Sequence, residues 1–157
     1  MIDSDWLLET VRRSLREPAP GRPHQTMLRR AISNRYYALF HEICRQTADL
    51  HVGSSPGARK SDRYALIYRL PEHSRMRSVF KAVQGSASSS IDAQHVAAVF
   101  IDLQEARHRA DYDPRARFRR AEVSFSLVDV ELALHSLRSA FADKDIVLTK
   151  LIARDRG

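Results

Sequence analysis

Apolar residues recur at intervals of three and four along most of the chain, which is the spacing of amphipathic helices. Runs of alternating polar and β-branched residues, which indicate strands, are missing. The pattern predicts an all-α fold, an antiparallel helical bundle with four core helices and short extra helices, in a single domain over residues 1–157. The expected helices cover residues 3–16, 25–50, 62–68, 71–83, 91–111 and 123–141, with a helical C-terminal tail near 143–155.

The helix over 25–50 has the clearest pattern, and it is apolar in two directions. One narrow face carries Leu28, Ile32, Leu39, Ile43 and Leu50, extended on one side by Tyr36 and Phe40. The far side carries Tyr37, Cys44 and Ala48. A helix of this kind is either central in a bundle or shared between the bundle and a partner subunit.

Shorter signals mark where helices begin and end. Ser4 is a candidate N-cap for the first helix. The apolar stripe of that helix is Trp6, Leu7, Val11 and Leu15. The stretch "VGSSPGARKSD" predicts a mobile polar loop near residues 51–61, and Pro71 suits the first turn of a later helix. Ser90 or Asp92 is expected to cap the helix over 91–111.

That helix carries an arginine on its apolar face. Its stripe is made of Val96, Val99, Phe100, Leu103 and Ala110. Arg107 falls between the last two of these, and Asp111 lies one turn further along the same side. A charged group there needs a partner. It either pairs with Asp111 or a neighbouring helix, or lies in a polar cleft at a subunit interface, or lines a phosphate site that suits its fixed fork of donors.

The chain carries 26 basic and 19 acidic residues, a formal net charge of +7. Most of the basic residues are arginine, so the charge is either a feature of composition or a surface that attracts polyanions such as RNA or DNA. The run "RARFRR" follows Pro114. It either joins Arg107 in one basic groove or points elsewhere.

Several classes of function are disfavoured by what the sequence lacks. The single cysteine, Cys44, excludes an internal disulfide framework and a thiolate cluster, and a reducing cytoplasm is the natural compartment. No His-x-x-x-His pair or paired-cysteine motif occurs, so we expect neither a metal site nor a cofactor. P-loop, Rossmann and G-x-S-x-G motifs are missing as well. An acidic N-terminus and the lack of a long apolar run predict no signal peptide and no membrane span.

Two stretches resemble a known family. "RRAISNRYYALFHEICRQTADL" resembles the second helix of small bacterial HEPN-domain proteins, and "EARHRADYDP" resembles the end of their fourth helix, where an R-x-x-A-D-Y pattern recurs. The resemblance covers roughly Met27 to Phe141. It implies an antiparallel helical bundle that is usually dimeric. Many family members are metal-independent endoribonucleases, often toxins or defence factors, and some are paired with a nucleotidyltransferase.

The family's active site is an R-x4–6-H motif on the fourth helix, completed by two subunits. Arg107 matches its arginine, and His108 takes the polar position that follows. The place of the histidine holds Tyr112, Asp113 or Pro114, so the chain departs from the motif there. Tyr112 is the candidate to orient a phosphate or donate a proton. The residues expected to bind or orient are Asp111, Arg109, His41, Tyr36 and Arg35.

Two functions follow from this resemblance. The first is a dimeric binding and assembly module of a toxin–antitoxin or defence system, acting on nucleic acid or on a protein partner such as an antitoxin or a nucleotidyltransferase. The two-faced helix, the missing histidine and the basic charge favour it. The alternative is a metal-independent endoribonuclease with a composite dimer site around Arg107, in which Tyr112 acts with His41 or His108.

Overall fold

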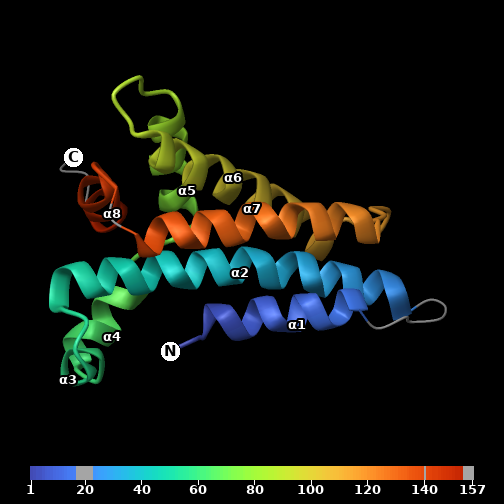
Figure 1. Cartoon of the computed structure of the whole chain (residues 1–157), viewed down its shortest axis with the longest axis horizontal. Coiled ribbons are helices and arrows are strands. Elements are labelled where there is room, and N and C mark those ends of the chain that lie inside the picture. The colour runs from blue at the N-terminus through green and yellow to red at the C-terminus, as the bar shows by residue number, and fades with distance from the viewer. Residues whose placement is uncertain (17–22, 140, 154–157) are drawn as a thin grey trace.

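A computed structural model describes residues 1–16, 23–139 and 141–153 of the chain. These residues form helices connected by turns and contain no strand, so the predicted all-α helical bundle is confirmed (Figure 1). The helices are α1 (Ser4–Arg16), α2 (Pro23–Val52), α3 (Pro56–Arg59), α4 (Asp62–Arg69), α5 (His73–Gln84), α6 (Ile91–Tyr112), α7 (Arg120–Arg138) and α8 (Lys144–Ile152).

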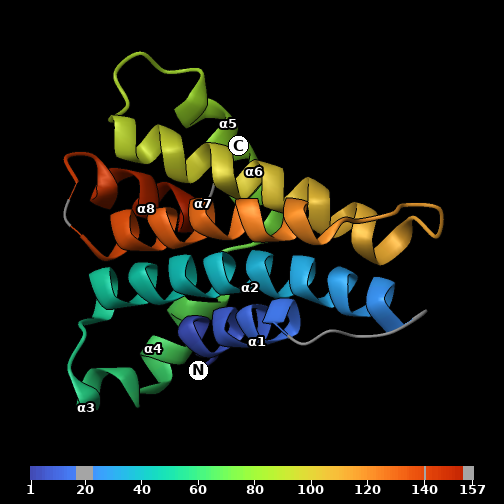
Figure 2. The same cartoon turned by 45° about the vertical axis from the view of Figure 1, so that its right-hand side comes forward.

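The 30-residue helix α2 is the centre of the bundle. It packs against α1, α4, α6 and α7 along its length, and it also contacts α3 and α8. Both views place α5, α6, α7 and α8 on one side of α2 and α1, α3 and α4 on the other (Figures 1 and 2). Side chains from both predicted apolar directions are buried, among them Leu28, Ile32, Tyr36, Leu39, Ile43, Cys44 and Ala48. The chain's own helices therefore cover both directions of α2.

The long helices alternate in direction. Along the horizontal axis of Figure 1, α1 and α6 run one way, whereas α2 and α7 run the other. The expected apolar positions of α7 are buried: Val123, Leu127, Val130, Leu134 and Leu137. Phe141 follows the end of this helix and packs partly against the core. One continuous hydrophobic cluster reaches from α1 to α8, so the elements share a core.

The first helix differs from its prediction in two details. Asp3, not Ser4, is the N-cap, because its Oδ1 accepts hydrogen bonds from the backbone N–H groups of Asp5 and Trp6 at 2.9 and 3.1 Å. Trp6 is 66% exposed, whereas Leu8 and Val11 are buried. The buried stripe is therefore rotated from the predicted one, since α1 turns Leu8 rather than Trp6 toward the core.

The segment expected to be a polar loop is largely helical. The helix α2 continues to Val52 and ends at Gly53, whose φ of 108° lies in the left-handed region that glycine adopts without strain. The short helix α3 follows, and Ser55 caps it through its side chain. Only a bend remains between the two helices because this cap lets α3 begin at Pro56.

Other helix boundaries differ from their predicted positions by a few residues. Pro71 is buried ahead of α5 rather than in its first turn, because Glu72 is the N-cap. Ser90, one of the two expected caps of α6, accepts a hydrogen bond from the N–H of Ala93. The C-terminal tail is helical over α8, and its predicted continuation through residues 154 and 155 lies outside the described residues.

A buried carboxylate on α2 ties the bundle together. Glu42 is 1% exposed and forms ion pairs with Arg45 on its own helix and with Arg138 of α7. Gln46 also donates to it, at 3.0 Å. Burial acts to raise the pKa of Glu42, but the hydrogen bonds from Arg45, Gln46 and Arg138 outweigh that effect and hold the pKa below its usual range. Glu42 therefore stays charged inside the bundle.

Replacing this carboxylate will destabilise the fold. We expect Glu42→Gln to lower the free energy of unfolding by about 2–4 kcal/mol, because two arginines lose a buried counter-charge. Urea denaturation followed by circular dichroism measures the change. The control is Glu131→Gln, which removes the partly exposed partner of Arg12 and is expected to cost less than about 1 kcal/mol. Equal losses in the two variants would contradict the structural role of Glu42.

Candidate functional site

The last turn of α6 is fastened to α2 by one arginine. Arg29 of α2 donates to the carbonyl oxygens of Ala110, Asp113 and Ala116 at 2.6, 2.8 and 2.8 Å. Ala110 is in the last turn of α6, where a helix end leaves carbonyl acceptors without partners inside the helix, and Asp113 and Ala116 lie just beyond that end. Ser33, one turn along α2, donates to Asp111 Oδ1 at 2.7 Å. The turn of α6 that carries the sequence motif is therefore held in a fixed position.

Arg107 and Asp111 form the expected pair. The Nε of Arg107 lies 2.6 Å from Asp111 Oδ2, one helical turn away. This ion contact does not have the geometry of a hydrogen bond, so the buried Nε lacks a hydrogen-bond partner. On its other side, Arg107 Nη2 donates to the hydroxyl of Tyr37 on α2 at 3.0 Å. The guanidinium is thus held from two helices and is not an idle surface charge.

Three tyrosine rings surround this guanidinium. Its Cζ lies 5.9, 5.6 and 5.6 Å from the ring centres of Tyr36, Tyr37 and Tyr112. These distances are within the range of cation–π attraction. The Arg107 side chain remains 22% exposed, and Tyr112 is 64% exposed. The aromatic rings therefore limit the motion of Arg107 while leaving part of it open to a ligand.

Arg107 opens onto a groove of about 550 Å³ between the start of α5 and the end of α6. Its lining consists of Ser74 and Arg77 from α5 and Gln104, Glu105, Arg107, His108 and Arg109 from α6. Arg77 is neutralised by Glu105 and also donates to Gln104 at 3.0 Å. The ring of His108 lies against that of Tyr112, with centroids 5.0 Å apart. Cationic and aromatic groups thus share one open surface.

The fold brings a second histidine, His73, close to Arg107. His73 begins α5, and its Nδ1 shares a hydrogen bond with the hydroxyl of Tyr36. Its ring stacks on Phe40 with centroids 4.2 Å apart. Burial, and then the positive charge of Arg107, lower the pKa of His73. Because this histidine comes from a different helix, no spacing in the sequence indicates that it lies here.

His41 and Tyr36 lie behind the groove rather than in it. The Nδ1 of His41 pairs with the hydroxyl of Tyr68 at 2.8 Å, and burial followed by the charge of His73 lowers the pKa of His41. The centroid of its ring lies 6.1 Å from that of Tyr37, the residue that accepts a hydrogen bond from Arg107. Tyr36 is buried in the core. Both residues position the site from behind.

The other two expected binding residues have different positions. Arg109 is exposed and lines the groove. Arg35 is buried against α7, where its Nη1 donates to the carbonyl of Val123 at 3.2 Å, and it does not line the groove. Arg35 therefore lies away from Arg107, because α2 directs it toward α7.

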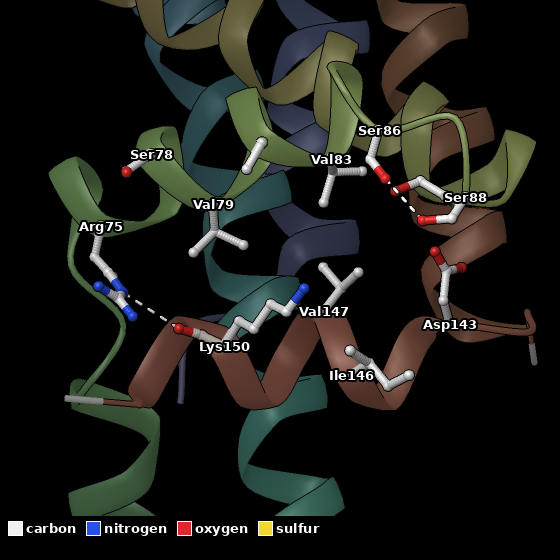
Figure 3. Close-up of a pocket in the computed structure, with 12 residues that line it drawn as sticks. Arg75, Ser78, Val79, Val83, Ser86, Ser88, Asp143, Ile146, Val147 and Lys150 are labelled. Carbon is white, nitrogen blue, oxygen red and sulfur yellow. Dashed lines mark hydrogen bonds between the residues drawn. The ribbon is translucent and has the colours of Figure 1, made fainter. Parts of the chain in front are cut away.

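A separate cavity of about 390 Å³ lies between α5 and α8 (Figure 3). Its wall combines Val79, Val83 and Val147 with polar groups at the rim, among them Asp143 and Lys150. Arg75 closes one end by donating to the carbonyl of Lys150 at 3.2 Å. None of the catalytic or binding residues predicted from the sequence lines this cavity. Three of the expected site residues, Arg107, His108 and Arg109, line the groove instead.

Comparisons with known proteins give no match. No protein-family model, no curated protein and no solved structure matches this chain. The resemblance to HEPN domains therefore rests on the two sequence motifs. Within residues 1–16, 23–139 and 141–153, no group of His, Cys, Asp and Glu could hold a metal ion. None of the helices in those residues combines the length and the apolar character that a membrane span requires.

Proposed function

We propose that the protein is a HEPN-type module of a toxin–antitoxin or defence system and that it binds RNA in the groove around Arg107. The observation that carries this proposal is the held but accessible guanidinium beside an exposed tyrosine. Guanidinium groups bind phosphate oxygens through a planar fork of donors. Exposed aromatic rings stack on the bases of single-stranded RNA.

RNA fits the groove better than a protein partner does. His108, Arg109 and Tyr112 are exposed around Arg107, and the net charge of +7 attracts a polyanion from a distance. The support from Tyr37 and Asp111 fixes Arg107 before the ligand arrives, which reduces the entropy lost on binding.

Removing the guanidinium will weaken RNA binding. We expect Arg107→Gln to raise the Kd for a short single-stranded RNA by about 10-fold or more, since a charge-assisted hydrogen bond contributes about 1.5–3 kcal/mol. Fluorescence anisotropy at fixed salt measures the change. Arg63→Gln is the control, because Arg63 is exposed on α4 and the change in charge is the same. Tyr112→Ala, at an exposed residue, is expected to weaken binding without unfolding the protein. The same Kd for the Arg107 and Arg63 variants would contradict the proposal.

Cleavage of the bound RNA is a second candidate function, and the position of His73 favours it. Metal-independent cleavage requires a base for the 2′-hydroxyl, an acid for the leaving 5′-oxygen and a cation on the phosphate. Arg107 supplies the cation. His108 lines the groove beside it, and His73 is close enough for the charge of Arg107 to lower its pKa. The lowered pKa of His73 keeps it neutral near pH 7, in the form that accepts a proton.

Cleavage is tested by incubating the protein with RNA in EDTA across a range of pH. We expect cleavage by the wild type and a loss of at least 10-fold in both Arg107→Gln and His73→Gln. Because the pKa of His73 lies below its usual value of about 6.5, the wild-type rate is expected to fall on the acid side only below that pH. No cleavage by the wild type, or equal cleavage by all three proteins, would remove this candidate.

The proposed module is a homodimer, and the outer face of α7 is its proposed interface. Phe125, Val128 and Leu132 are exposed at helical spacing and form one apolar stripe. Exposed stripes of this kind indicate contact with another protein. The apolar directions of α2 are already covered within the chain, so they do not supply this interface.

Sedimentation velocity tests the dimer. We expect the wild type to sediment as a dimer and Leu132→Glu to shift it toward the monomer by placing a charge in the interface. Leu66→Glu is the matched control, because Leu66 is also an exposed leucine but lies on α4. A wild type that is monomeric at every concentration, or equal behaviour of the two variants, would contradict an α7 interface.

A further inference from the structure

A second, smaller cavity lies on the other side of Arg109. It measures about 200 Å³ and is bounded by α2, α6, the segment before α7 and the first turns of α7. Its polar lining comes from three arginines, one glutamate and one serine: Arg35, Arg109, Arg117, Glu122 and Ser126. Arg109 lines this cavity and also the groove beside Arg107, so the two hollows are neighbours.

Arg35 carries a buried charge that forms no ion pair with a carboxylate among the described residues. The residue is 3% exposed. One hydrogen bond, from Nη1 to the carbonyl of Val123, is made, whereas Nε has no partner. Burial lowers the pKa of Arg35 to about 10, and Asp129 counters this only in part. An unpaired buried guanidinium is costly, and an anion in the cavity would offset that cost.

The remaining groups make the cavity attractive to an anion. Arg117 is exposed, and it belongs to a segment in which Ala116 and Phe118 are buried. Phe118 is fixed to α2, since its N–H donates to Gln25 at 3.1 Å and its carbonyl accepts from Gln25 at 2.9 Å. This segment therefore holds Arg117 at the rim.

The one carboxylate in the lining is already engaged. Glu122 accepts a hydrogen bond from the backbone N–H of Arg119, the N-cap residue of α7, at 2.9 Å. The first turns of this 19-residue helix also present the positive end of its dipole to the cavity wall. The lining contains three arginines and one glutamate, so its net charge is positive.

We propose that this cavity binds a phosphate group and that it is a second phosphate subsite for RNA held in the neighbouring groove. The RNA part of the proposal rests on the proposed function. A phosphate offers oxygens in several directions, which suits arginines that arrive from α2, α6 and the segment before α7. Because Arg109 lines both hollows, one strand contacts Arg107 and Arg117 from successive phosphates.

Inorganic phosphate tests the cavity directly. We expect phosphate to raise the midpoint of thermal unfolding relative to chloride at the same ionic strength, because a ligand that binds only the folded state stabilises it. Arg117→Gln is expected to weaken phosphate binding by at least 10-fold. Arg115→Gln is the matched control, since Arg115 is exposed two residues away and does not line the cavity. The same phosphate response in the two variants, or none in the wild type, would overturn the site.

A buried-residue variant adds an independent measurement. Arg35→Met keeps an unbranched apolar stem but removes the guanidinium and its charge, and it is expected to abolish the phosphate response. If this variant does not fold, the Arg117 and Arg115 pair still decides the question, because both of those residues are exposed.

RNA with a 5′-phosphate or a 5′-hydroxyl identifies the source of the phosphate group. A preference for 5′-phosphate that is lost in Arg117→Gln indicates a terminal phosphate, whereas an equal loss of affinity for both RNAs indicates an internal phosphodiester. Unchanged affinity for both RNAs would overturn the subsite while the groove still binds RNA. If the wild type binds phosphate through Arg117 but binds no RNA, the phosphate cavity stands and the proposed function fails.

Discussion

The burial of α2 is the constraint on which the rest of the structure depends. A 30-residue helix enclosed by its neighbours must place its polar side chains against partners, since a buried polar group without a hydrogen bond is costly. Glu42 meets this requirement through Arg45 and Arg138, and this network connects α2 to α7. Arg35 meets it incompletely, which is why the cavity beside it attracts an anion.

The same constraint positions the candidate site. Arg29 and Tyr37 are both on α2, and both reach the last turns of α6. Arg29 donates hydrogen bonds to carbonyls at the end of that helix. The hydroxyl of Tyr37, which is half-buried, accepts a hydrogen bond from Arg107. The guanidinium is therefore held by α2 and by Asp111 of its own helix, and a group held in this way is ready for a ligand.

Local spacing predicted most of the helices and the pair of Arg107 with Asp111, because residues four apart on a helix are neighbours whatever the tertiary structure. It did not predict His73, which reaches the site through the packing of α5 on α6. It also predicted that Trp6 lies on the apolar face of α1, whereas the helix buries Leu8 and leaves Trp6 exposed. Periodicity identifies an apolar face to within a fraction of a turn, and only packing against α2 decides which residues of α1 are enclosed.

The central claim is that Arg107, held by its tyrosines and Asp111, is the group that contacts RNA. The most direct measurement is the side-chain Nε–Hε resonance of Arg107 in an NMR titration with short single-stranded RNA, assigned by its absence in Arg107→Lys. We expect the Arg107 resonance to be visible already without RNA and to shift in proportion to binding, while that of Arg138 stays fixed. An Arg107 resonance that does not shift while RNA binds would contradict the account.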